Sequence, residues 1–276
     1  MTATTATTST TAMSAVTSMA FVTDGGAAGL DTAAGSAAGV RSRPARPQLF
    51  CLPHAGGSAA GFRPWRRRVG AHVRVHPVEL PGRGARWDEP PPARLPALVA
   101  DLAARVRAEA DDGPYLLYGH SFGALLAYEL AHALRNGPGE PAALLVSGRN
   151  GPGVPHPALP LHALPKERLI ERLRTLDGVP AALVGKPELI DPFLPVLRAD
   201  ARIAELYRRG RHPVLNCPVH VFAGDRDPLA DPAGLRRWAE ETTAGCEVQT
   251  APAGHMVTGH PAFLAWLEQT VSGLAA

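Results

Sequence analysis

The feature that most constrains the fold of this chain is an alternation, beginning after residue 46, of short apolar runs with longer amphipathic stretches. Several apolar runs are continuous, as in strands that are covered on both faces. Such strands separated by helices are typical of an α/β fold with a mostly parallel sheet flanked by helices. The predicted strands are Gln48–Pro53, Val73–Leu80, Tyr115–Tyr118, Ala142–Ser147, Val219–Ala223 and Glu247–Thr250. The predicted helices are Leu95–Ala110, Phe122–Arg135, Pro232–Thr242 and Pro261–Val271.

One stretch, from about residue 149 to residue 212, interrupts this alternation. It holds no convincing strand and runs through many prolines into three short amphipathic pieces, Lys166–Leu176, Glu188–Leu197 and Arg202–Arg208. Insertions of this length are usually functional. We therefore predict a helical lid between two strands of the sheet; the alternative is a helical decoration with no role in access.

Residues 1–46 have a different composition, rich in Ala, Thr, Gly and Ser and almost free of large apolar side chains. Such a segment cannot bury enough surface to offset the entropy lost on ordering. We predict a disordered low-complexity tail followed by a single domain over residues 47–276. A later start of translation, at Met13 or Met19, is the alternative.

The overall composition excludes several classes of protein. Hydrophobic residues make up 45% of the chain, enough for a large core, and the net charge of +3 is too diffuse to favour nucleic acid. The three cysteines are scattered, which argues against a disulfide framework or a zinc site and fits a reducing cytoplasm. No apolar stretch approaches the roughly 18 residues that cross a bilayer, and the start lacks a secretory signal. We expect a cytoplasmic protein that binds no membrane.

The sequence Gly119-His120-Ser121-Phe122-Gly123 lies between an apolar strand and an apolar helix. The G-x-S-x-G pattern alone is weak, but strand, sharp turn and helix together form the setting of a nucleophile elbow. The turn would hold the Ser121 hydroxyl above the sheet, with glycines where a Cβ would collide with a neighbour. This context favours Ser121 as a nucleophile over an ordinary capping serine.

A serine nucleophile needs a base and an acid, which follow it in this order of elements as acid and then histidine. Beyond the turn that ends at Pro228, only His255 and His260 remain of eleven histidines. His255 follows the last predicted strand, whereas His260 precedes a proline at a helix start, where capping is its expected role. For the acid, the usual G-x-x-D placement selects Asp227, with Asp225 as the alternative.

An oxyanion hole requires two backbone N–H groups. One is expected from Phe122, the residue after the nucleophile. The second is expected from Ala55, in the glycine-rich loop Pro53-His54-Ala55-Gly56-Gly57 after the first strand. A plain glycine-rich turn is the alternative for this loop. No Gly-Lys-Ser/Thr follows it, so a nucleotide site is not expected.

Seven segments in order resemble the type II thioesterases, stand-alone editing enzymes of polyketide and nonribosomal peptide assembly lines. They are Leu52–Ser58 with Trp65, Glu79–Gly84, Gly119–Ala124, Leu197–Asp200, Cys217-Pro218, Gly224–Pro228 and Gly254-His255. The resemblance covers residue 47 to the C-terminus and implies an α/β-hydrolase fold with a helical lid. It implies hydrolysis of acyl groups from the phosphopantetheine thiol of an acyl or peptidyl carrier protein. The N-terminal tail has no counterpart in the family, and Phe122 stands where Met is frequent.

This chemistry requires a triad and an oxyanion hole but no metal and no other cofactor. We expect a monomer that binds an acidic carrier transiently through basic clusters at Arg66–Arg68 and Arg208-Arg209, or else on the lid or around Arg83 and Arg86. The alternative for each cluster is a solvated helix face. The alternatives are a generic carboxylesterase, a chain-releasing thioesterase, or a non-catalytic binding protein that kept the fold.

Overall fold

A computed structural model describes residues 46–156, 160–178 and 189–275. The predicted tail lies outside these ranges except for Arg46, so its disorder stays a prediction. Six strands form one sheet in the order β2-β1-β3-β4-β5-β6, and every neighbouring pair is parallel. The strands are β1 (Gln48–Leu52), β2 (Arg74–Pro77), β3 (Tyr115–His120), β4 (Ala143–Ser147), β5 (Val219–Gly224) and β6 (Cys246–Ala251). The predicted α/β fold and all six predicted strands are confirmed.

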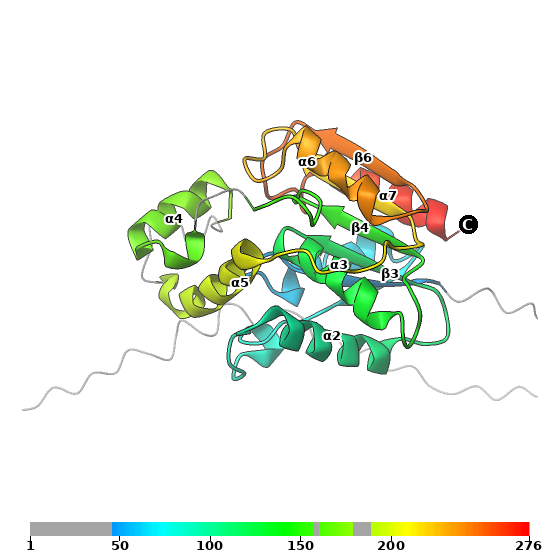
Figure 1. The fold of residues 1–276 in the computed structure, drawn as a ribbon, viewed down its shortest axis with the longest axis horizontal. Helices are drawn as coiled ribbons and strands as arrows, with labels where there is room; N and C mark the ends of the chain where they lie inside the picture. The colour runs from blue at the N-terminus through cyan, green and yellow to red at the C-terminus, as the bar shows by residue number, and fades with distance from the viewer. Residues whose placement is uncertain (1–45, 157–159, 179–188, 276) are drawn as a thin grey trace, which may run out of the picture. The chain divides into compact units, whose positions relative to one another are not determined.

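Helices cover both faces of this sheet (Figure 1). The α-helices are α1 (Trp65–Val69), α2 (Leu95–Glu109), α3 (Phe122–Leu134), α4 (Lys166–Thr175), α5 (Leu194–Leu206), α6 (Pro232–Arg236) and α7 (Pro261–Leu274). The short 3-10 helices are η2 (Ala59–Phe62), η3 (Gly84–Arg86), η4 (Leu161–Ala163), η7 (Asp191–Phe193) and η8 (Arg237–Glu241). The predicted helix Pro232–Thr242 is therefore an α-helical turn that continues as a 3-10 helix.

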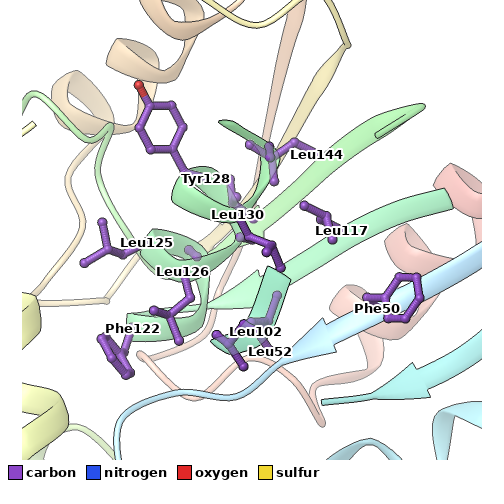
Figure 2. Packing of buried hydrophobic residues seen from close by; sticks show 14 of the residues in the cluster. Phe50, Leu52, Leu102, Leu117, Phe122, Leu125, Leu126, Tyr128, Leu130 and Leu144 are labelled. Atoms are coloured by element: carbon purple, nitrogen blue, oxygen red, sulfur yellow. The ribbon is translucent and has the colours of Figure 1, made fainter. Parts of the chain in front are cut away.

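The alternating side chains of the central strands pack into two separate apolar cores. Phe50 and Leu52 of β1 pack into the core beneath α2 and α3, whereas Leu49 and Cys51 pack into the core beneath α1 and α7. Figure 2 shows side chains of α3, among them Leu130, packed within the first of these cores. Burial on both faces explains why the strands read as continuous apolar runs.

The described part of the insertion between β4 and β5 is helical, and α4 and α5 lie beyond one end of the sheet (Figure 1). The predicted pieces Glu188–Leu197 and Arg202–Arg208 are wrong as separate helices, because one continuous helix, α5, spans Leu194–Leu206. Asp200, which lies between the two predicted pieces, is inside this helix, and its side chain is fully buried and paired with an arginine. The predicted helix Lys166–Leu176 is confirmed as α4.

Within the three described ranges, no helix has the length and apolarity needed to cross a bilayer. In the same ranges, no group of three or more His, Cys, Asp and Glu side chains is arranged to hold a metal ion.

Candidate active site

Ser121 lies at the sharp turn between β3 and α3, as the nucleophile elbow predicts. Its backbone has φ 56° and ψ −111°, a conformation that L-residues rarely adopt. A Cβ at Gly119 would lie 2.0 Å from the carbonyl oxygen of Gly123, and a Cβ at Gly123 would lie 2.1 Å from that of Leu52. The turn is therefore as tight as backbone atoms allow, and both glycines are required by packing.

The structure brings Ser121, His255 and Asp227 into one hydrogen-bonded chain. Nε2 of His255 lies 3.0 Å from Oγ of Ser121, and Nδ1 of His255 lies 2.8 Å from Oδ2 of Asp227. His255 and Asp227 are buried. Because the carboxylate accepts from Nδ1, Nε2 is left without its proton and faces the hydroxyl as an acceptor.

The loops after β5 and β6 position the acid and the histidine. A Cβ on Gly224 would lie 2.2 Å from the carbonyl oxygens of both Ala253 and Gly254, so the two loops touch backbone to backbone. The N–H of Leu229 donates to Oδ1 of Asp227 at 2.8 Å and fixes the carboxylate plane. Asp225, the alternative acid, is about half exposed and lies beside Arg226. His260 accepts from the N–H of Ala262 and caps α7, the role expected of it.

Both predicted oxyanion donors line the same cavity as Ser121 and His255. Phe122 is the first residue of α3, so its N–H has no acceptor within the helix and lies at the positive end of the helix dipole. The N–H of Ala55 makes no hydrogen bond to any residue in the described part of the chain. Both N–H groups are thus available to a ligand.

A polar network under the elbow was missed by the sequence analysis. Nδ1 of His120 lies 2.9 Å from Oγ of Ser147, which lies 2.6 Å from the Tyr118 hydroxyl. His120 and Ser147 are register partners at the ends of β3 and β4. The available signal in the sequence was a polar residue at the end of each of two apolar strands. Burial holds the pKa of His120 well below its ordinary value, with smaller contributions from His255 and His54.

His54 lies beside His120. Burial, and then the neighbouring His255 and Arg83, lower the pKa of His54 to about 4. Its ring faces that of His120 at a centroid distance of 5.9 Å, and the ring of His120 lies 5.1 Å from that of His255. Two neutral imidazoles therefore flank His255 at neutral pH. They add no positive charge to oppose a proton on His255.

The cavity in front of Ser121 has a volume of about 400 Å³ and is lined mainly by apolar side chains. Ser121, His255 and the loop at Ala55 form its polar end. Its apolar wall comes largely from the insertion, with Leu173 and Leu176 at the end of α4 and with residues of α5. The polar end can hold a reacting carbonyl, and the apolar wall suits an acyl chain.

The basic clusters differ in their surroundings. Arg66 and Arg67 on α1 are exposed, while Arg68 pairs with Glu268. Arg208 is exposed, but Arg209 pairs with the buried Glu241. The two arginines of the alternative docking position are buried in ion pairs, and docking around them or on the lid stays a prediction. These arginines are Arg83 and Arg86.

The comparisons with known proteins all point to one family. The chain matches the thioesterase domain family over residues 47–269. It is 34% identical over 212 residues to the gramicidin S biosynthesis protein GrsT of Aneurinibacillus migulanus, covering 76% of this chain and 82% of that protein.

Two solved structures extend the match to the fold. RedJ, a thioesterase from the prodiginine pathway of Streptomyces coelicolor, is 36% identical, with a TM-score of 0.77 over 85% of this chain and 91% of RedJ. BorB, a type II thioesterase from the borrelidin cluster, is 37% identical, with a TM-score of 0.74 over 83% of this chain and 95% of BorB. The chain therefore belongs to the thioesterase family, with the α/β-hydrolase fold of its relatives, and is a hydrolase that acts on thioesters.

Proposed function

We propose that this enzyme removes acyl or aminoacyl groups from the phosphopantetheine arm of a carrier protein, as an editing type II thioesterase of polyketide or nonribosomal peptide synthesis. The observation that carries the proposal is the Asp227–His255–Ser121 chain at the polar end of an apolar cavity. The assembly-line role is supported by relatives such as BorB, which is named a type II thioesterase of a biosynthetic cluster.

In the first half of the reaction, Oγ of Ser121 attacks the thioester carbonyl carbon while Nε2 of His255 takes the hydroxyl proton. The carbonyl oxygen becomes an oxyanion held by the N–H groups of Ala55 and Phe122. Collapse of this intermediate breaks the carbon–sulfur bond, and the imidazolium returns its proton to the leaving sulfur. A thiol has a pKa of about 8.5, so it leaves without strong acid assistance.

In the second half, water attacks the acyl ester on Ser121, and His255 takes a proton from that water. A second oxyanion forms in the same hole, and its collapse frees the carboxylic acid and returns the proton to Oγ. Asp227 stays ionised throughout and stabilises the imidazolium in both halves. The flanking His54 stays neutral because its pKa is about 4, so it does not compete for these protons.

Labelling with a fluorophosphonate and Ser121→Ala together test the proposal. We expect stoichiometric labelling at Ser121, identified by peptide mass spectrometry, and a loss of turnover of about 10⁴-fold or more in Ser121→Ala. The melting temperature should stay the same, because one hydroxyl in a strained turn adds little stability. Activity of Ser121→Ala within tenfold of the wild type would overturn the assignment.

A second measurement separates the proposed substrate from its alternatives. Carrier-bound acyl thioesters should be hydrolysed with a higher kcat/KM than matched oxygen esters, which lack the good leaving group. Equal rates on the two would favour a carboxylesterase. Cyclised rather than hydrolysed product would favour a chain-releasing enzyme.

A further inference from the structure

Two segments of the family resemblance, neither of which holds a triad residue, contact each other in the structure. Arg83 follows β2 in the segment Glu79–Gly84, and Asp200 lies on α5 in the segment Leu197–Asp200. Nη1 and Nη2 of Arg83 donate to the two carboxylate oxygens of Asp200 at 2.5 and 2.9 Å. Asp200 is fully buried and Arg83 is 3% exposed. This is a bidentate ion pair withdrawn from water.

The pair also holds the loop that carries Ala55. The N–H of Gly56 donates to Oδ2 of Asp200 at 2.9 Å, and Nη1 of Arg83 donates to the carbonyl oxygen of Gly57 at 3.3 Å. One carboxylate oxygen thus accepts from both the arginine and the backbone of the loop. The contact spans 144 residues of sequence, from the loop after β1 to the insertion.

The geometry of the loop explains what this contact fixes. The N–H of Gly57 donates to the carbonyl of His54 at 2.9 Å, which closes a turn with Ala55 and Gly56 at its centre. Gly56 has φ +74°, as the third residue of a type II turn requires. Types I and II differ in the orientation of the central peptide group, and the N–H of that group is the one bonded to Asp200. Asp200 therefore holds the central peptide in one orientation.

We propose that Arg83 and Asp200 are positioning residues that set the oxyanion loop and couple its geometry to the lid helix α5. The proposal rests on the proposed function, in which the N–H of Ala55 stabilises the oxyanion. A flip of the Ala55–Gly56 peptide would rotate the backbone next to that N–H. The helix that carries Asp200 also lines the cavity through Leu197 and Ala201, so a movement of α5 reaches the oxyanion loop.

Two double variants isolate the contact. Arg83→Met with Asp200→Leu removes both charges and the acceptor for the Gly56 N–H, and fills the space with apolar groups, which usually preserves folding. Arg83→Gln with Asp200→Asn removes the charges but keeps a carboxamide oxygen that can accept from Gly56. We expect kcat to fall about 10²-fold in the first variant, with KM within about threefold, and to recover to within roughly fivefold of wild type in the second.

Inhibitor binding provides a readout that a merely structural role would not move. Oγ of Ser121 adds to the carbonyl carbon of a trifluoromethyl ketone and forms a covalent adduct that carries an oxyanion. A thioether analogue of the substrate binds without forming an oxyanion. The Met/Leu variant should lose affinity for the ketone by about the same factor as kcat/KM and keep its affinity for the thioether. Arg86→Met is the matched control, since Arg86 lies three residues away and pairs with the half-buried Asp101 in a contact that does not touch the oxyanion loop. Its kcat should stay within about twofold of wild type.

The outcomes separate this inference from the proposed function. A kcat of the Met/Leu variant within about threefold of wild type, or equal losses in both double variants, would overturn the inference while labelling at Ser121 stands. Equal losses of ketone and thioether affinity would also overturn it, since they show damage to the cavity. Absence of labelling at Ser121 in the wild type would overturn both.

Discussion

Two helices of 13 residues border the active-site cavity, and they are held in different ways. In α3, which starts at the elbow, ten residues are buried, and all of them are apolar, aromatic or glycine. In α5, which belongs to the insertion, six residues are buried and one of them is the carboxylate of Asp200. Further polar contacts hold α5, among them two from arginines. Arg198 donates to the carbonyl of His162, and Arg149 donates to that of Ala204 in its last turn.

The difference indicates what each helix contributes. Helix α3 is fixed by shape, so the elbow that it follows keeps its geometry as long as the core keeps its volume. Helix α5 buries fewer apolar residues and depends more on a few directional polar contacts, which fail individually when one partner moves. The triad residues all lie outside the insertion, on loops of the sheet. The insertion contributes the apolar wall and, through Asp200, a hold on the oxyanion loop.

The largest expected effect concerns the catalytic triad, which lies on loops of the sheet outside the insertion. Asp227→Asn should lower kcat by about 10⁴-fold, because loss of the carboxylate leaves His255 in the wrong tautomer. Asp225→Asn is the matched control and should stay within about threefold of wild type, since Asp225 does not touch His255. Steady-state kinetics on one carrier-bound thioester measure both. Greater damage from Asp225→Asn would show that the turn has been interpreted the wrong way.

Stability should separate the two helices next. Leu130→Ala on α3 should lower the free energy of unfolding by about 3–5 kcal/mol, because Leu130 is fully buried and its loss leaves a cavity. Arg198→Ala on α5 removes one hydrogen bond to His162 and should cost about 1 kcal/mol. Urea unfolding at one pH compares them. Similar losses would mean that α5 depends on packing as much as α3 does.

Low pH should lower the free energy of unfolding through a histidine of α3, His132. Burial, with smaller effects from His212 and nearby arginines, lowers the pKa of His132 on α3 to about 3 from its ordinary value of 6.5. Below pH 6.5 the unfolded chain binds a proton that the folded chain refuses, so stability is full above that pH and falls as the pH decreases toward the folded value. Each such histidine contributes a slope of about 1.4 kcal/mol per pH unit in this window.

His132→Gln therefore tests this origin of the acid sensitivity. The variant should show a shallower decline in unfolding free energy between pH 6.5 and pH 5 than the wild type, measured by urea unfolding at several pH values. His54, with its pKa lowered to about 4, accounts for part of the slope that remains. An unchanged slope in His132→Gln would mean that this side chain is protonated in the folded enzyme.

The smallest expected effect concerns docking of a carrier protein through exposed charges. Arg66→Glu with Arg67→Glu on α1, and separately Arg208→Glu just after α5, should each lower kcat/KM for a carrier-bound thioester by about threefold to tenfold at low salt. The value of kcat should hold, and the deficit should shrink as salt rises. A small free thioester is the control and should be hydrolysed as before. Equal losses on both substrates would indicate damage to the fold instead of the docking surface.

The parts of this molecule that sequence predicts well are those whose signal is local. Several strands are continuous apolar runs, and the elbow joins one of them to an apolar helix, so both could be predicted along with Ser121. His255 and Asp227 could be placed because the order of elements leaves few candidates. The structure places all three within hydrogen-bonding reach.

The parts that sequence missed depend on partners far apart in the chain. Arg83 and Asp200 are separated by 117 residues, and nothing in either segment indicates the other. The helix α5 was predicted as two pieces, and the structure shows that it continues through Asp200, whose buried charge is balanced by the distant Arg83. The network of His120 with Ser147 was missed because strand register has to be known before two strand ends can be compared.

The crowding around Gly119 and Gly123 has a consequence for tracing the ancestry of this fold. Both glycines are demanded by backbone atoms of neighbouring segments, whatever the serine between them does. A descendant that lost catalysis but kept the turn would keep the two glycines under the same selection. The pentapeptide therefore records inheritance of a shape, whereas the contact of His255 with Ser121 records retention of a reaction. A survey that separates active from inactive members of such a lineage should therefore give more weight to the histidine and the aspartate than to the G-x-S-x-G motif.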